Sequence, residues 1–261
     1  MDLGIAGRVA LVTAASSGLG RAIAVALAAE GVHVAVTGRS EERLAATVEE
    51  CAGHGVSALA VAWDLADHGR ADEVAGRVAA ELGPVDILVN NTGGPPSTPA
   101  LGQDSGLWEG MYGAMVLPVI RLTDAVVGGM RERGWGRVIT STSSGPIAPI
   151  ARLGISNTLR ASLHSWSKTV ANEVAADGVT ANVIVPGRIA TARTEALDRG
   201  RAEREGRTVE EVGHDARAGI PAGRYGRPEE YGAVAAFLAS RQAAYVTGSV
   251  VRVDGGQIPA V

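Results

Sequence analysis

Cysteine and lysine are almost absent from this chain of 261 residues. Cys51 is the only cysteine, so no intrachain disulfide can form, and this usage fits a reducing cytoplasm. One cysteine and five scattered histidines provide no cluster with metal-ligand spacing, so we expect no metal site. Lys168 is the only lysine, and arginine therefore carries nearly all of the positive side-chain charge. These absences exclude a disulfide-stapled secreted domain.

Basic blocks and long apolar runs are also missing. The formal net charge is −4 and no basic stretch stands out, so we expect no nucleic-acid partner. The N-terminus has no signal pattern, and no uninterrupted apolar run approaches the ~18 residues of a membrane helix. We therefore expect a cytoplasmic protein without a membrane partner. Hydrophobic residues make up 46% of the chain, enough for one large domain over residues 1–261.

Apolar runs typical of buried strands alternate with helical patterns along most of the chain. Such alternation predicts a parallel sheet covered on both faces, and right-handed crossovers then give a doubly wound arrangement. The expected fold class is α/β, a Rossmann-type doubly wound parallel sheet of about seven strands with helices on both faces. Strands are predicted at 9–12, 32–36, 56–62, 85–89, 136–141, 180–185 and 249–253, and helices at 21–29, 41–52, 71–82, 107–133, 156–176 and 229–239.

The segment 189–221 interrupts this alternation. It is charged and mixed in character, and it contains Gly200 and Gly206. We interpret it as a helical excursion over the sheet, and predict that it forms a mobile lid over the substrate rather than a second domain.

A turn of small residues, Thr13 to Gly20, follows the first predicted strand and precedes the first predicted helix. Strand, small-residue turn and helix is the layout that binds a dinucleotide pyrophosphate. The helix start offers unpaired backbone N–H groups to the phosphate, and Gly18 and Gly20 let the backbone approach closely. Taken alone, the turn is also compatible with an ordinary Gly/Ser turn.

Several further motifs, in the same order, resemble those of the short-chain dehydrogenase/reductase family. They are Trp63-Asp64-Leu65, Asn90-Asn91-Thr92-Gly93, Pro186-Gly187, Arg227-Pro228-Glu229-Glu230, Val246-Thr247-Gly248 and Val253-Asp254-Gly255-Gly256. The resemblance covers essentially the full length. It implies that a dinucleotide is bound by Thr13, Ala15, Ser16, Ser17, Gly18, Leu19, Arg39, Ser40, Asp64, Leu65, Asn91, Thr92, Gly93, Arg160, Pro186, Ile189 and Thr191.

Arg39 indicates which dinucleotide is preferred. It ends the second predicted strand, where an acidic residue would bind the ribose 2′-hydroxyl of NAD. Its planar guanidinium suits a 2′-phosphate instead, so NADPH is the expected cofactor. Two alternatives stay open at this stage: Arg39 is a solvated residue at a strand end, and Asp64 is a turn former rather than a partner of the adenine. Ala14 stands where the family usually has glycine, a substitution that only a positive φ would disfavour.

The family's catalytic residues are largely missing. The resemblance implies an asparagine, a serine, a tyrosine and a lysine, the last two four residues apart on one helix. Ser143 stands at the serine position, but Ser156 occupies the tyrosine position and Arg160 the lysine position. Met115 stands at the asparagine position, and Lys168 lies two helical turns beyond Arg160, too far along the helix to replace the lysine.

This loss has a chemical consequence. Ketone reduction needs a proton at oxygen, and a serine hydroxyl is a much weaker acid than the family's tyrosine. Arginine cannot relay a proton because it stays protonated, although it can donate hydrogen bonds and supply positive charge. We therefore expect Ser143, Ser156 and Arg160 to bind the carbonyl and the ribose without acting as a general acid.

The predicted function is an NADPH-dependent ketoreductase of a small molecule, such as an aromatic polyketide antibiotic, with the proton supplied by substrate or water. The pattern resembles the atypical reductases of antibiotic tailoring. Two alternatives remain: a non-catalytic NADP-binding protein, and a dehydratase or epimerase on the same fold. The long predicted helices and the resemblance both suggest a homodimer or homotetramer.

Two further features are open to more than one interpretation. Trp108, Met111, Tyr112 and Met115 share one helix face, which either packs internally or borders the substrate. His164 follows Arg160 by one turn on the same helix face, and a structural or interface role is expected for it rather than the alternative of proton donation.

Overall fold

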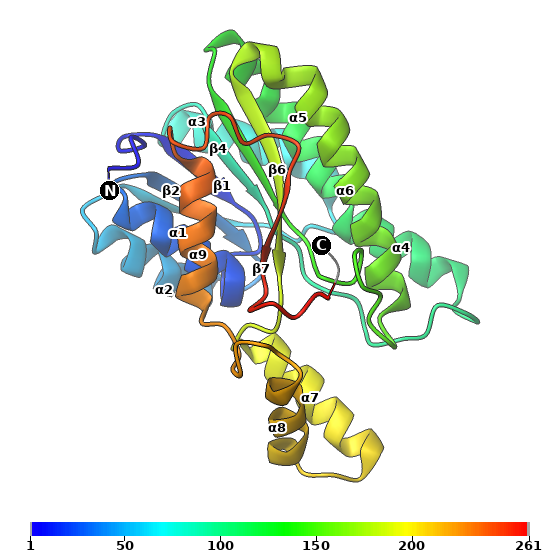
Figure 1. Ribbon diagram of the computed structural model, residues 1–261. Helices are drawn as coiled ribbons and strands as arrows, with labels where there is room; N and C mark the ends of the chain where they lie inside the picture. Colours follow the sequence, from blue (N-terminus) through cyan, green and yellow to red (C-terminus); the bar gives the residue numbers. More distant parts are fainter. Residues whose placement is uncertain (1, 260–261) are drawn as a thin grey trace.

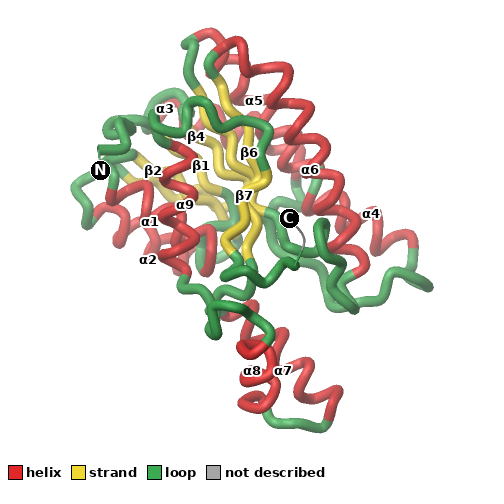
Figure 2. The backbone as a smooth tube through the Cα atoms, in the orientation of Figure 1, coloured by secondary structure: helices red, strands yellow, loops and turns green. Residues whose placement is uncertain are grey.

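A seven-stranded parallel sheet forms the centre of the computed structural model, which describes residues 2–259 (Figures 1 and 2). The strand order is β3-β2-β1-β4-β5-β6-β7. The strands are β1 (Val9–Val12), β2 (His33–Gly38), β3 (Ala58–Ala62), β4 (Ile87–Asn90), β5 (Gly136–Ser141), β6 (Val179–Pro186) and β7 (Val250–Val253). The order reverses direction between β1 and β4, so the carboxyl ends of these two strands flank a crevice suited to a ligand. The predicted fold class is confirmed.

Helices cover both faces of the sheet. On one face lie α1 (Gly18–Ala29), α2 (Glu41–Ala52) and α9 (Pro228–Ala239), whose buried side chains share one apolar cluster with the sheet. On the other lie α3 (Ala71–Glu81), α5 (Leu117–Glu132) and α6 (Gly154–Val174), which contribute to a second cluster. The sheet is therefore buried on both sides, which is why its strands are apolar at successive positions.

The single helix predicted over residues 107–133 is wrong. The structure has two helices there, α4 (Ser105–Met115) and α5, with Val116 between them. Pro118 lies in the first turn of α5, where a proline without an N–H is tolerated. In the interior of one long helix it would remove a hydrogen bond and clash with the preceding turn, so the helix is interrupted.

The segment Ser105–Glu132 is long and apolar enough to cross a membrane when only length and composition are considered. Our requirement for an uninterrupted apolar run did not detect it. In the structure α5 buries Leu122, Val126 and Met130 in the same cluster as Leu88 of β4. Such packing is that of a core helix against a sheet, so the segment is weak evidence for a membrane span.

A helical hairpin between β6 and α9 projects from the carboxyl edge of the sheet (Figure 1). It consists of α7 (Ala192–Glu205) and α8 (Val209–Ala218), so the helical character predicted for 189–221 is confirmed, but the hairpin extends away from the sheet instead of lying over it. Thr191 caps α7 by accepting a hydrogen bond from the Thr194 backbone, and Thr208 forms a capping box with Glu211. Local signals thus specify both helices.

Candidate active site

The turn between β1 and α1 presents free backbone donors at a helix start. Ser17 is the N-cap of α1 but its side chain makes no capping hydrogen bond, so the hydroxyl remains available. Gly18 has a φ of +57°, a conformation that glycine adopts without strain. The first amide groups of α1 and the positive end of its dipole together suit an anionic phosphate.

Ala14 departs from the expectation for this turn. Its φ is +47°, in the left-handed region that disfavours a residue with a Cβ. The cost of this conformation is about 1–2 kcal/mol. The surrounding hydrogen bonds hold it: the Ala14 carbonyl accepts from Asn91 Nδ2 at 3.2 Å, and the Ala15 amide donates to the Thr37 carbonyl at 2.8 Å.

Thr13 and Asn91 join the ends of β1 and β4. The Thr13 hydroxyl donates to the Asn91 carbonyl at 2.7 Å and accepts from the Asn91 amide at 2.8 Å. Thr13 is only 2% exposed and its hydroxyl is used in this link, so it positions the site rather than facing it. These hydrogen bonds hold together the carboxyl ends of β1 and β4, which flank the crevice.

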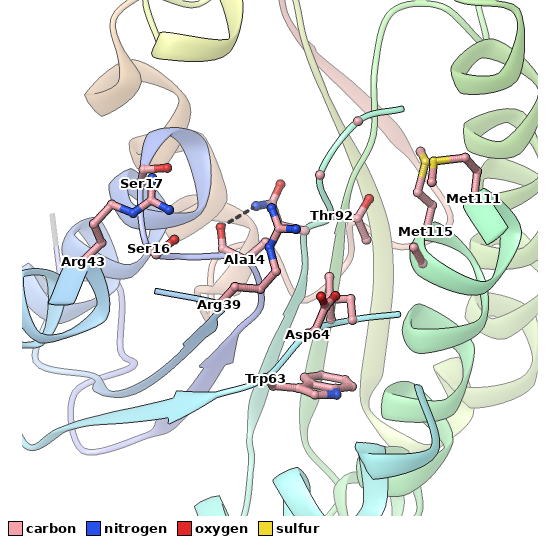
Figure 3. Close-up of a pocket in the computed structure, with 16 residues that line it drawn as sticks. Ala14, Ser16, Ser17, Arg39, Arg43, Trp63, Asp64, Thr92, Met111 and Met115 are labelled. Carbon is pink, nitrogen blue, oxygen red and sulfur yellow. Dashed lines mark hydrogen bonds between the residues drawn. The ribbon is translucent and has the colours of Figure 1, made fainter. Parts of the chain in front are cut away.

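One pocket, of about 390 Å³, lies between this turn and the end of β3. Figure 3 shows Arg39 and Arg43 on the side of Ser16 and Ser17, and Met111 and Met115 across from them. Predicted cofactor residues that line it are Ser16, Ser17, Arg39, Asp64, Leu65, Asn91, Thr92 and Gly93.

Arg43 was missed by the sequence prediction. It lies on α2, four residues after Arg39, and both arginines border the same pocket. No local signal separates Arg43 from the other polar residues on that helix, because the rotation of α2 against the sheet decides which of them faces the pocket. Asp64 is the one carboxylate among the residues that line the pocket, against two arginines, so the donor set fits an adenosine that carries an extra phosphate. The residues present therefore fit NADP.

A second pocket, of about 400 Å³, forms a cleft over the carboxyl ends of β4, β5 and β6. It brings together the three predicted catalytic residues, Ser143, Ser156 and Arg160. Predicted cofactor residues at this cleft are Ser17, Gly18, Leu19, Asn91, Thr92, Gly93, Arg160, Pro186, Ile189 and Thr191. The turn that would hold the pyrophosphate and the predicted carbonyl-binding residues thus share one cleft.

Two hydroxyls in this cleft are available to a ligand. Ser156 is 6% exposed, lines the cleft and has no hydrogen-bond partner among residues 2–259. The Ser143 oxygen accepts from the Gly145 amide at 3.2 Å, which leaves its proton free to be donated. Both hydroxyls can therefore donate a hydrogen bond to a ligand in the cleft.

Arg160 is a buried brace. Its guanidinium donates to the carbonyl oxygens of Ser141 at 3.2 Å, Thr92 at 3.2 Å and Gly93 at 3.0 Å. Burial lowers its pKa to about 10, with a smaller lowering from Arg193, so it remains cationic at neutral pH. It supplies positive charge beneath the cleft while it ties β5 to the loop after β4.

Several residues lie elsewhere than predicted. Neither pocket is lined by Ala15, which is fully buried in the core, or by Ser40, whose side chain caps α2 by accepting from the Arg43 amide. Met115 is buried with Ile155 and lines the first pocket rather than the cleft. Lys168, by contrast, agrees with its prediction: it lines a different hollow and not the cleft.

Arg188 and Arg193 were missed by the sequence prediction, and both line the cleft. The Arg188 guanidinium pairs with the buried Asp198 of α7. The Arg193 side chain donates to the Pro95 carbonyl at 2.9 Å and so links α7 to the opposite wall. No local pattern marks either residue, because each contact joins segments that are separate in sequence.

Comparisons with known proteins match nearly the whole of this chain to reductases. A family model described as enoyl-(acyl carrier protein) reductase matches residues 13–257. The 3-oxoacyl-(acyl-carrier-protein) reductase FabG of Escherichia coli is 36% identical over 256 residues, which cover 96% of this chain and 97% of that protein. The acetoacetyl-CoA reductase of Rhizobium meliloti is 35% identical over 251 residues, which cover 96% and 98% respectively.

Two solved structures are also similar over nearly the whole chain. The L-sorbose reductase from Gluconobacter frateurii, complexed with NADPH and L-sorbose, has a TM-score of 0.94 and 33% identity, with 100% of both chains covered. A variant of the actinorhodin polyketide ketoreductase with NADPH has a TM-score of 0.92 and 31% identity, with 97% of this chain and 98% of that one covered.

Proposed function

Since the chain belongs to the short-chain dehydrogenase/reductase family of oxidoreductases, we propose that it is an NADPH-dependent ketoreductase of a small-molecule carbonyl compound. The observation that carries the proposal is the cleft in which the free hydroxyls of Ser143 and Ser156 lie beside the phosphate-binding turn at Gly18. One site can therefore hold a dinucleotide and a carbonyl together.

NADPH is the cofactor that this site fits. Arg39 and Arg43 would bind the 2′-phosphate, and the start of α1 would bind the pyrophosphate. When bound, the reduced nicotinamide supplies a hydride to the carbonyl carbon. The L-sorbose reductase and the actinorhodin ketoreductase were both solved with NADPH, which supports this assignment.

The chain's own residues orient the carbonyl without supplying a strong acid. Ser143 and Ser156 donate hydrogen bonds to the substrate oxygen, and the buried charge of Arg160 stabilises negative charge that develops there. Neither serine is acidic enough to act as the general acid near neutral pH. We therefore propose an atypical active site in which substrate or water provides the proton.

An aromatic polyketide antibiotic is the substrate class that we propose. A hydroxyl beside the carbonyl of such a compound would compensate for the weak acids of the site. The replacement of the tyrosine and lysine resembles the simocyclinone angucyclinone ketoreductase, and the similarity to the actinorhodin polyketide ketoreductase supports the same class. NADPH oxidation across a panel of carbonyl compounds, with product masses, tests the proposal. A gain of two hydrogens indicates reduction, a loss of water a dehydratase, and no oxidation a non-catalytic NADP-binding protein.

The cofactor preference depends on Arg39. We expect NADPH to bind more tightly than NADH, and Arg39→Ala to reduce the difference about 10- to 100-fold, because a charge-assisted phosphate contact contributes ~1.5–3 kcal/mol. Fluorescence titration with both cofactors measures the change, and NADH affinity provides the internal control. Equal affinities in the unaltered protein would contradict the preference.

We also propose that residues 189–221 act as a lid. The hairpin of α7 and α8 buries few side chains, and its contacts with the body include the Arg188–Asp198 pair and the Arg193–Pro95 hydrogen bond. Limited trypsin digestion is expected to cut first near Arg207, between the two helices, with NADPH and substrate giving protection. If trypsin cut other segments earlier than it cut the hairpin, the result would argue against a mobile lid.

We also propose that the protein is a homodimer or homotetramer. Light scattering at micromolar concentration tests this proposal.

A further inference from the structure

Thr142 and His164 form a hydrogen-bonded pair that the proposed chemistry does not use. Thr142 directly follows β5 and precedes Ser143, and it lines the cleft. His164 lies on α6 one helical turn after Arg160. The Thr142 Oγ1 and His164 Nε2 atoms are 2.9 Å apart.

The pair connects two separate hollows. Thr142 is 5% exposed and borders the cleft. His164 is half-buried and borders a second, more open hollow together with Ser165, Lys168 and Gly248. A continuous path of two side chains therefore runs from the cleft through the layer between β5 and α6 to the outside.

The neighbouring hydroxyls do not provide this path. Ser141 is hydrogen-bonded to the Tyr231 hydroxyl at 2.9 Å, and burial raises the pKa of that phenol well above its ordinary value. Ser143 lines the cleft, and its hydroxyl oxygen accepts a hydrogen bond from the Gly145 amide. Of the three consecutive residues, Thr142 alone has a partner that reaches the second hollow.

Burial, together with the charge of Arg160, favours the neutral form of the His164 imidazole. Burial lowers the pKa of His164, and the cationic Arg160 lowers it further. Lys168, one turn further along α6, borders the same hollow and adds positive charge on the other side. A neutral imidazole has one N–H and one free nitrogen lone pair, so it can give a proton at one nitrogen and take one at the other.

We propose that Thr142 and His164 relay a proton from solvent to the substrate oxygen, in place of the family's tyrosine and lysine. Thr142 passes its hydroxyl proton to the reduced carbonyl oxygen in the same step in which it receives the proton of His164 Nε2, so no threonine alkoxide forms and the weak acidity of an isolated hydroxyl does not apply. His164 Nδ1 takes a proton from water in the outer hollow, and the resulting hydroxide is neutralised by bulk solvent. The two electrons and the hydrogen on carbon come from NADPH, so the relay accounts only for the proton on oxygen. The inference rests on the proposed ketoreductase function and specifies its water route.

Two variants and one control test the relay in the whole chain of 261 residues. Thr142→Val keeps the side-chain shape without the hydroxyl. His164→Gln keeps a hydrogen-bonding side chain, but its amide cannot take a proton at one atom while it gives a proton at another. Each is expected to lower the single-turnover rate of NADPH oxidation about 100-fold, the lower end of a general acid–base contribution, with NADPH affinity unchanged. Thr169→Val is the matched control, because that α6 hydroxyl bonds only to the Ser165 carbonyl in its own helix.

His164→Ala provides the readout that a purely structural role would not produce. Free imidazole entering the outer hollow is expected to raise its rate about tenfold, but not to raise the rate of Thr142→Val, whose cleft-side link is missing. In the cofactor-free protein, Thr142→Val should also shift the ¹⁵N NMR signal of His164 Nε2.

Each contrary outcome is distinct. Rates within twofold of the unaltered protein for Thr142→Val and His164→Gln would overturn the relay alone. Slow variants that imidazole does not rescue, or an unmoved His164 signal, would also overturn it and leave a positioning role. A lack of NADPH oxidation by the unaltered protein with every carbonyl compound would refute the ketoreductase function, and the relay with it.

Discussion

Replacement of Arg160 by methionine is expected to lower the free energy of unfolding by about 3–5 kcal/mol. Three buried carbonyls lose their hydrogen-bond donor, at a cost of ~1–3 kcal/mol each, and removal of the buried charge offsets part of this loss. The accepting residues are Ser141, Thr92 and Gly93. Methionine is flexible and fills the space of the aliphatic part of arginine, so most of the loss would report the hydrogen bonds of the guanidinium.

Cofactor binding should fall together with stability in this variant. The backbone at Thr92 and Gly93 lines both pockets, and without Arg160 nothing ties it to the end of β5 in the same way. Denaturant unfolding measures the stability, and NADPH fluorescence titration measures the binding. Arg199→Met, at an exposed position on α7, is the control and should change the free energy of unfolding by no more than about 0.5 kcal/mol. Equal losses in the two variants would show that Arg160 is not a brace.

Substitution of Gly20 by alanine is expected to cost about 2–3 kcal/mol of stability, as overpacking does in a tight core. A Cβ at this position would lie 2.5 Å from the Ala14 carbonyl oxygen and 2.9 Å from both Ala15 Cα and Asn91 Nδ2. Two of these atoms are backbone, so the start of α1 must move away from the turn. We expect NADPH affinity to fall about 10- to 100-fold as the pyrophosphate contacts are displaced.

Gly76→Ala is the matched control for Gly20→Ala. Gly76 lies on α3, and a Cβ there would meet no atom within 4 Å. Alanine should stabilise that helix by about 0.5–1 kcal/mol without affecting the cofactor. Differential scanning calorimetry and NADPH titration compare the two. Unchanged NADPH affinity in Gly20→Ala would show that the close approach of α1 to the turn is unimportant for binding.

Local patterns were sufficient for most of the secondary structure. The helix 41–52 and the strand 136–141 have the predicted bounds, because an N-cap serine and an apolar run are both local signals. The prediction of one helix over 107–133 failed because the apolar periodicity continues across Pro118, which begins a new helix. The helix break follows from the chemistry of one residue.

The candidate site was only partly predictable. Arg39 directly follows a recognisable strand, so its place beside the pocket between the β1–α1 turn and the end of β3 followed from strand order. Arg43 reaches the same pocket because of how α2 is rotated against the sheet. Its polar neighbours on the helix surface resemble it in sequence, so only packing distinguishes it.

Taken by itself, the sequence determined the α/β fold class, the phosphate-binding turn and the absence of a tyrosine and lysine at 156 and 160. These properties depend on residue type and on the spacing of residues within short stretches. Both can be read directly from the sequence. The tertiary structure alone decided that Ala14 has a positive φ, that Arg160 is buried against three carbonyls, and that Thr142 meets His164. Each of these depends on how β5, α6 and the loop after β4 pack together. The physical reason is that burial and pairing are set by contacts between segments far apart in the chain, which no local pattern encodes.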